Sequence, residues 1–131
     1  MPAKHVFEYA VVRVVPRVER EEFLNVGVIL YCRDQQFLQC RFAAPTDRLR
    51  AFAGPLLDCD ELTARLQAFE RICQGRREGG PIGQLGPAER FRWLTAQRST
   101  VVQTSPVHPG LSADAAATLE RLFGQLVDLT P

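Results

Sequence analysis

The stretch that decides the fold is His5–Cys32, HVFEYAVVRVVPRVEREEFLNVGVILYC, in which two apolar runs flank a charged connection. The runs His5–Val15 and Leu24–Cys32 are rich in β-branched and aromatic residues, which favour strands. Pro16 ends the first run, because proline has no N–H to donate within a paired strand. We therefore expect two antiparallel strands joined by the charged residues 17–22.

A third apolar run, Phe37–Ala43, follows a short polar segment at residues 33–36, and this spacing is typical of a hairpin. The three runs predict an antiparallel meander. Much later in the chain, Ser99–Gln103 (STVVQ) has the same β-branched character and is expected to form a fourth strand.

The segments after the meander carry apolar residues at helical spacing. Thr46 is expected to cap a short helix, Asp58 a longer one and Ser112 the last one, because their side-chain oxygens accept hydrogen bonds from the first turn. Pro87 suits the first turn of another short helix. The core-facing residues of the two longer helices are expected to be Leu62, Leu66, Phe69 and Cys73 in one, and Leu119, Leu122, Phe123, Leu126 and Val127 in the other.

A glycine-rich segment, Gly75–Gly86, interrupts the helical pattern, since five of its twelve residues are glycine. We expect it to be a mobile loop. The length of 131 residues fits a single domain over residues 1–131. The expected fold class is α+β: an antiparallel β-sheet, made of the N-terminal meander and the later fourth strand, packed with about four helices.

Charge and composition narrow the classes of function. The formal net charge is +1, so the chain as a whole does not attract nucleic acid or an anionic membrane. The chain is arginine-rich, because Lys4 is its only lysine and the other fifteen basic residues are arginine. Arginine binds phosphates and carboxylates through its forked guanidinium, but a GC-rich genome produces the same bias. The sequence leaves both explanations open.

The cysteines lie too far apart for a C-x-x-C pair, so neither a metal nor another cofactor is expected. Charged residues interrupt the apolar run near the start, which argues against a signal peptide. No stretch has the roughly 18 apolar residues of a membrane span. We expect a cytoplasmic protein, away from the membrane, with reduced thiols at Cys32, Cys40, Cys59 and Cys73.

The first candidate site lies within the opening pair of strands. If Arg13 pairs across from Asn25, a charge and an amide share an otherwise apolar face, and Glu22 lies within reach of the arginine. Gly27, inside a strand, either marks a bulge or lets a ligand approach the backbone. On this register the mixed face also holds Gly27, Tyr9, Val11 and Ile29, and the apolar core face holds Ala10, Val12, Val14, Leu24, Val26 and Val28.

Two interpretations of this group remain open. In one, Arg13 binds an anion or carboxylate while Glu22 and Asn25 orient it. In the other, Arg13 and Glu22 form an ion pair that holds the connection between the strands, and Asn25 binds loop backbone. The sequence has no nucleophile, metal-ligand set or phosphate loop beside the group, which favours the structural interpretation.

The second candidate site lies in residues 89–108, where arginines alternate with the only tryptophan. Arg98 and Ser99 at a helix-to-strand turn suggest a phosphate site, and His108 is a candidate general base. The alternation is also typical of surfaces on which nucleic-acid bases stack. Structural explanations exist as well: Trp93 as a core anchor, and His108 as a surface loop residue.

Two strings, RVVPRVEREEFLNVGVILYC and ERFRWLTAQRSTVVQTSPVH, together resemble an uncharacterised bacterial family, the domain of unknown function 3037. The resemblance runs from about Phe7 to Val127 and brings no established activity. It implies a gene neighbourhood shared with kinases of the HipA toxin type, and so a candidate partner. Gln97 and Pro109 depart from the family pattern, so the loops beside them differ here. The residues carried over are Arg13, Pro16, Glu22, Phe23, Asn25 and Gly27, and Arg90, Trp93, Arg98, Ser99, Gln103 and His108.

Three functions from different classes follow. The first is a small cytoplasmic binding or accessory protein that recognises another protein, with a HipA-type kinase as the candidate partner. The second is a small enzyme acting on an anionic phosphate or carboxylate substrate through Arg13, Glu22, Arg98 and His108. The third is nucleic-acid binding through residues 90–98, which the near-neutral net charge argues against. No catalytic motif is present, so the sequence favours the first and leaves open whether the chain is an enzyme.

Overall fold

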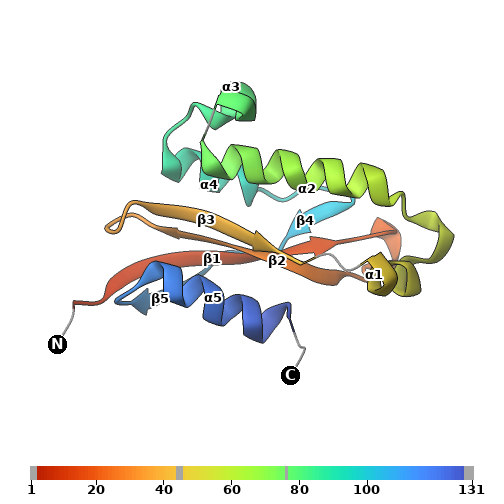
Figure 1. The fold of residues 1–131 in the computed structure, drawn as a ribbon, viewed down its shortest axis with the longest axis horizontal. Helices are drawn as coiled ribbons and strands as arrows, with labels where there is room; N and C mark the ends of the chain where they lie inside the picture. Colours follow the sequence, from red (N-terminus) through yellow and green to blue (C-terminus); the bar gives the residue numbers. More distant parts are fainter. Residues whose placement is uncertain (1–2, 44–45, 76, 129–131) are drawn as a thin grey trace.

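An antiparallel β-sheet lies between two layers of helices in a computed structural model that describes residues 3–43, 46–75 and 77–128 (Figure 1). The strand order is β3-β2-β1-β4, and β5 also pairs with β1. The helices α2 and α4 cover one face of the sheet and α5 covers the other. The strands are β1 (His5–Val14), β2 (Leu24–Cys32), β3 (Phe37–Phe42), β4 (Val102–Thr104) and β5 (His108–Ser112), and the helices are α1 (Thr46–Ala53), α2 (Cys59–Gln74), α3 (Gly80–Gly83), α4 (Pro87–Leu94) and α5 (Ala115–Leu126).

The predicted α+β class and the N-terminal meander are confirmed, because the three apolar runs form β1, β2 and β3 in antiparallel pairing. The predicted fourth strand at Ser99–Gln103 is displaced toward the C-terminus, since β4 begins at Val102. The sequence does not indicate β5, because that strand contains Pro109 and Gly110, which have low β propensity. Pairing along β1 forms it instead.

The sequence correctly predicts some, but not all, of the residues that cap the helices. Asp58 caps α2 as predicted, since its carboxylate accepts hydrogen bonds from the N–H groups of Asp60 and Glu61. The cap of α5 is Asp114 and not Ser112, because the Asp114 side chain accepts from the first turn of the helix. Thr46 begins α1 as a helical residue, and the position before it lies outside the described residues.

The glycine-rich segment is not the uninterrupted loop that its composition predicts. It contains a helical turn at Arg77–Gly79 and the short helix α3. Gly75 ends α2 at φ 71, a left-handed conformation, and its N–H donates to carbonyls of the last turn. Glycine is favoured here because it adopts positive φ without steric cost.

A β-bulge in β2 decides which side chains face which helical layer. Val12 of β1 pairs with Gly27, but the next residue, Arg13, pairs with Asn25, so Val26 is an extra residue on the β2 side. A bulge of this kind places two residues opposite one and reverses the alternation of side chains beyond it.

The bulge corrects the predicted assignment of faces. Ile29 belongs to the core under α2, and Val28 belongs to the core under α5, the reverse of the prediction. Gly27 also faces the α2 side, where the Phe42 side chain occupies the space that a Cβ atom would need. Gly27 inside the strand was the signal of a bulge in the sequence, but that signal does not say which side chains exchange faces.

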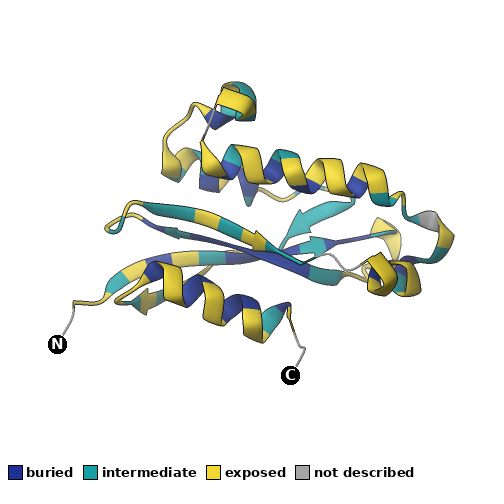
Figure 2. Cartoon of the chain, in the orientation of Figure 1, coloured by how far each residue is buried: buried dark blue, intermediate teal, exposed yellow. Residues whose placement is uncertain are grey.

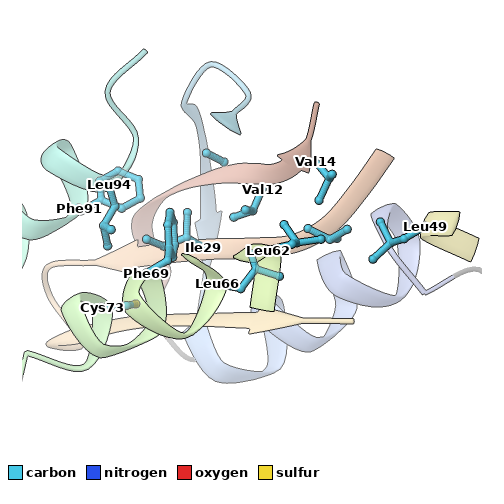
Figure 3. Close-up of a cluster of buried hydrophobic side chains, with 12 residues drawn as sticks. Val12, Val14, Ile29, Leu49, Leu62, Leu66, Phe69, Cys73, Phe91 and Leu94 are labelled. Carbon is cyan, nitrogen blue, oxygen red and sulfur yellow. The ribbon is translucent and has the colours of Figure 1, made fainter. Parts of the chain in front are cut away.

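Each face of the sheet has its own hydrophobic core. Under α2 and α4, Phe69 lies next to Ile29, and Phe91 and Leu94 belong to the same cluster (Figure 3). The outward faces of α2 and α5 are exposed (Figure 2). The predicted helix stripes are confirmed as sheet-facing: Leu62, Leu66, Phe69 and Cys73 are buried in α2, and Leu119, Leu122, Phe123 and Val127 are buried at α5, with Leu126 half-buried.

Ser105 joins the two short strands that share the edge of β1. Its Oγ accepts a hydrogen bond from the Val11 N–H at 2.8 Å, and its own N–H donates to the Val11 carbonyl at 2.8 Å. Its hydroxyl donates to the Pro106 carbonyl at 2.9 Å. Ser105 is only 3% exposed, so its hydroxyl replaces the backbone acceptor that is lost between β4 and β5.

We predict that Gly27→Ala destabilises the fold by about 1–3 kcal/mol, because overpacking forces neighbouring groups to move. A Cβ atom at Gly27 would lie 2.2 Å from Cδ1 of Phe42 and 2.8 Å from the Arg41 carbonyl oxygen. The matched control is Gly124→Ala in α5, where a Cβ atom meets nothing within 4 Å. The control should gain about 0.5–1 kcal/mol from helix propensity. Urea denaturation measures the free energy of unfolding of both variants. Equal stabilities of the two variants would contradict the bulge geometry.

Ser105→Ala should lower the free energy of unfolding by about 1–3 kcal/mol, because it leaves the buried Val11 N–H without an acceptor. Ser99→Ala, at an exposed position, should leave that free energy within about 0.5 kcal/mol of the parent. Thermal or urea unfolding compares the two variants. A Ser105→Ala variant as stable as Ser99→Ala would show that the hydroxyl does not hold the edge.

Candidate functional site

Three polar side chains stand in a row across β2, β1 and β4 on the α5 side of the sheet. Arg13 lies opposite Asn25 in one neighbouring strand and opposite Gln103 in the other. Directly paired residues share a face, so the three side chains project together. The predicted pairing of Arg13 with Asn25 is confirmed.

The Arg13 guanidinium carries a charge without a counter-ion. Its Cζ lies 3.9 Å from the centroid of the Phe23 ring, a cation–π contact. Its Nε is buried and has no hydrogen-bond partner, and none of the ion pairs of the described residues includes it. Burial lowers the pKa of Arg13, because desolvation penalises the charged form and no carboxylate offsets it.

Asn25 presents an unsatisfied acceptor beside this charge. Its Nδ2 donates to the carbonyl of Leu126 at the end of α5, at 3.1 Å. That bond fixes the amide orientation, because a carbonyl accepts only from the nitrogen. Oδ1 of Asn25 is therefore turned away from the helix end, and it is buried without a partner.

Gln103 is held in a similar way. Its Nε2 donates to the Thr100 carbonyl at 2.9 Å, which leaves the amide oxygen available as an acceptor. Two oriented amides thus flank one guanidinium. A group of this kind is suited to bind an anion at the guanidinium, with neighbouring oxygens ready for a donor.

An open pocket of about 260 Å³ lies at the guanidinium, and we call it the Arg13 pocket. Its rim includes two exposed apolar side chains, Phe23 at 44% and Val18 at 42%. Glu21 contributes a carboxylate and a strained backbone at φ 57, and it forms no ion pair with Arg13. The lining residues are Arg13, Val15, Val18, Glu21, Phe23 and Gln103.

Glu22 does not contact Arg13, so the predicted ion pair between them is wrong. Its carboxylate pairs with Arg20 instead, and both side chains are more than half exposed. Glu22 lines a separate hollow with Pro16 and Phe52. The helical turn Val18–Arg20 explains the change of partner, because it brings Arg20 back toward Glu22.

Gly27 is not a ligand position, because it faces the Phe42 side chain within the core under α2. Of the two roles predicted for it, the bulge is the one found. Asn25, by contrast, does bind backbone as one of the two interpretations expects, although the backbone belongs to the end of α5.

Arg98 and Ser99 lie away from the Arg13 pocket. The Arg98 guanidinium stacks on Trp93 at 4.2 Å and donates to the carbonyls of Leu94 and Trp93, so it closes the end of α4. Ser99 lines a hollow beside α2 with Glu61. Trp93 is 41% exposed, so its predicted role as a core anchor is wrong, whereas Phe91 is the buried aromatic residue of α4.

His108 lies in β5 and not in a surface loop. Its exposed ring lies 5.4 Å from that of Tyr9, the residue opposite it. Tyr9 and Arg13 are four residues apart on β1, which is about 13 Å along a strand. The four side chains of the predicted enzyme site, Arg13, Glu22, Arg98 and His108, are therefore not brought together.

Phe23 and Gln103 appear in the sequence analysis only among the residues that the family resemblance carries over, without a role in the site. Phe23 stands two positions before Asn25, on the same side of the strand, so period-two spacing was the available signal. For Gln103 the spacing gave no signal, because its pairing with Arg13 joins segments far apart in the chain.

Neither a metal site nor a membrane span is found within the part of the chain that the structure describes. No group of three or more His, Cys, Asp or Glu side chains there is placed to hold a metal ion. None of its helices combines the length and apolarity needed to cross a bilayer.

The single sheet, with helices on both faces, and the Arg13 pocket define an α+β protein with a small polar pocket. The chain belongs to the family described as "Protein of unknown function (DUF3037)", which matches residues 9–127 and confirms the resemblance. No curated protein and no solved structure matches it.

We predict that Arg13→Met leaves the free energy of unfolding unchanged or raises it by up to about 1 kcal/mol, because a half-buried charge without a counter-ion and its buried, unpartnered Nε are removed. Methionine keeps the contact with the Phe23 ring through its sulfur.

The matched control is Arg90→Met. Arg90 donates to the carbonyls of Leu85, Ile72 and Cys73, so this variant should lose about 2–3 kcal/mol. Guanidinium denaturation followed by far-ultraviolet circular dichroism compares the two. A loss at Arg13 as large as that at Arg90 would mean that Arg13 has a structural role.

Proposed function

We propose that this chain is a small cytoplasmic binding or accessory protein that docks onto another protein through the Arg13 pocket. The observation that carries the proposal is the charged guanidinium of Arg13, which forms no ion pair within the described residues, has a buried Nε without a hydrogen bond and lies beside an orphaned amide oxygen. An unsatisfied buried polar atom costs about 1–3 kcal/mol, so the arrangement does not serve stability.

The surroundings of Arg13 favour a protein partner over a small cofactor. The pocket of about 260 Å³ is smaller than the roughly 300–1,000 Å³ of sites for drug-sized ligands, and it fits a single carboxylate side chain. Arginine and aromatic residues are enriched among the residues that carry binding energy at protein interfaces. Phe23 and Val18 would supply the apolar contact around the charge.

A HipA-type kinase encoded nearby is the partner that we propose to test first. An acidic side chain of such a kinase would enter the pocket and pair with Arg13, with the exposed Phe23 ring packing beside it. The enzyme alternative has less support, because its acid–base candidates Glu22 and His108 contact other groups.

Co-expression with the neighbouring kinase, followed by purification through a tag on the kinase, tests this function. The wild-type chain should co-purify, and Arg13→Met should reduce the recovered complex by about ten-fold or more, since a desolvated charge pair is lost. Arg71→Met on the opposite side of the sheet serves as the control, because Arg71 is exposed and lies outside the pocket. Absence of a complex at micromolar concentrations, or equal recovery of Arg13→Met, would contradict the proposal.

A further inference from the structure

A second surface, on the α2 side of the sheet, is independent of the Arg13 pocket. The only tryptophan of the chain, Trp93, is 41% exposed at its rim. A groove of about 210 Å³ lies there between α2, the end of α4 and β4, and we call it the Trp93 groove. Its floor is apolar and is formed by Ala68, Phe69, Ile72, Leu94 and Val102.

Two arginines stand at the rim of this apolar floor. Arg98 is held in place, because it stacks on Trp93 at 4.2 Å and donates to the carbonyls of Leu94 and Trp93. Those bonds use two of its five N–H donors, which leaves others for a ligand. The ring and the cation are therefore fixed before anything binds, which reduces the entropy lost on association.

Arg65 provides the second charge, and its present partner holds it weakly. It pairs with Glu61 one helical turn earlier, and the two side chains are 47% and 55% exposed. Exposed pairs of this kind contribute little to stability. A carboxylate from a partner can therefore take the place of Glu61 at small cost.

The arrangement does not suit nucleic acid, although arginines alternate with Trp93 in the sequence. Arg90 is bound to three backbone carbonyls, and Phe91 is buried in the core, so neither is available to phosphates or bases. Single-stranded nucleic acid needs a continuous basic track with several exposed aromatic rings. Trp93 is the one exposed ring among the residues that line the groove.

We propose that the Trp93 groove binds a short acidic segment of a protein partner, in which one bulky apolar side chain is flanked by carboxylates. The apolar side chain packs on the groove floor against Phe69 and Leu94. The flanking carboxylates pair with Arg65 and Arg98. Trp93 covers the bound side chain from the rim.

Trp93 fluorescence tests the proposal directly, because no other tryptophan contributes to the signal. The probes are nine-residue synthetic peptides in which a central Leu, Met, Phe or other aromatic residue except tryptophan stands between glutamates. They are titrated up to about 1 mM, which detects binding free energies down to about −4 kcal/mol. At least one should shift the Trp93 emission to shorter wavelength in a saturable way. A peptide with serine at its centre should not.

Arg65→Glu should raise the Kd of the binding peptide about ten-fold, because it reverses one of the two rim charges. Arg71→Glu is the matched control on the same helix, exposed and outside the groove, and it should bind as the wild type does. Circular dichroism confirms that both variants are folded.

Three results would overturn the proposal. One is an unchanged emission with every peptide of the panel. Another is equal binding of the serine-centred peptide, which would mean that the apolar floor is not used. The last is saturable binding of a single-stranded oligothymidine with a steep salt dependence, which would assign the surface to nucleic acid.

Discussion

The bulge opposite Val12 is the constraint on which the other features of this fold depend. Side chains of β2 alternate between the two cores, and the extra residue shifts that alternation partway along, so it decides which side chain enters which core. On one side of the bulge, Ile29 lies under α2 and Val28 under α5. On the other side, Asn25 turns toward the end of α5 and stands beside Arg13. Core and candidate site thus come from a single irregularity.

The sequence predicted those features that are local. The strands of the meander, the Asp58 cap and the stripe of α2 follow from period, proline position and capping chemistry, and the structure contains all of them. Features that arise from pairing between distant segments escaped prediction. Gly27 indicated a bulge as one of two possibilities, but the resulting exchange of faces was not predicted. The strand β5 depends on β1 for its shape, and the partner of Glu22 depends on a short helical turn. Gln103 belongs to the same class, since only the sheet places it next to Arg13.

The arginine side chains of this protein differ in whether backbone carbonyls are available to accept their hydrogen bonds. Arg90 and Arg98 are bound to carbonyls at helix ends, where a cation complements the free acceptors and the helix dipole. Arg13 sits inside a sheet, where backbone acceptors are already used, and its neighbours offer an aromatic ring and amides. An arginine-rich composition therefore does not by itself indicate a binding site. The structural question is which guanidinium lacks acceptors, and within the described residues Arg13 is the clearest case.

The central position of β1 has a consequence for synthesis on the ribosome. Its partners β4 and β5, and the helix α5 that covers one face, all come from the last third of the chain. The meander and α2 emerge early, but the apolar surface formed by Phe7, Val28, Leu30 and Cys32 has no cover until α5 is made. The edge of β1 stays unpaired for the same interval. A nascent chain with such a bare edge is prone to aggregation, so completion of the fold is tied to release of the C-terminal residues.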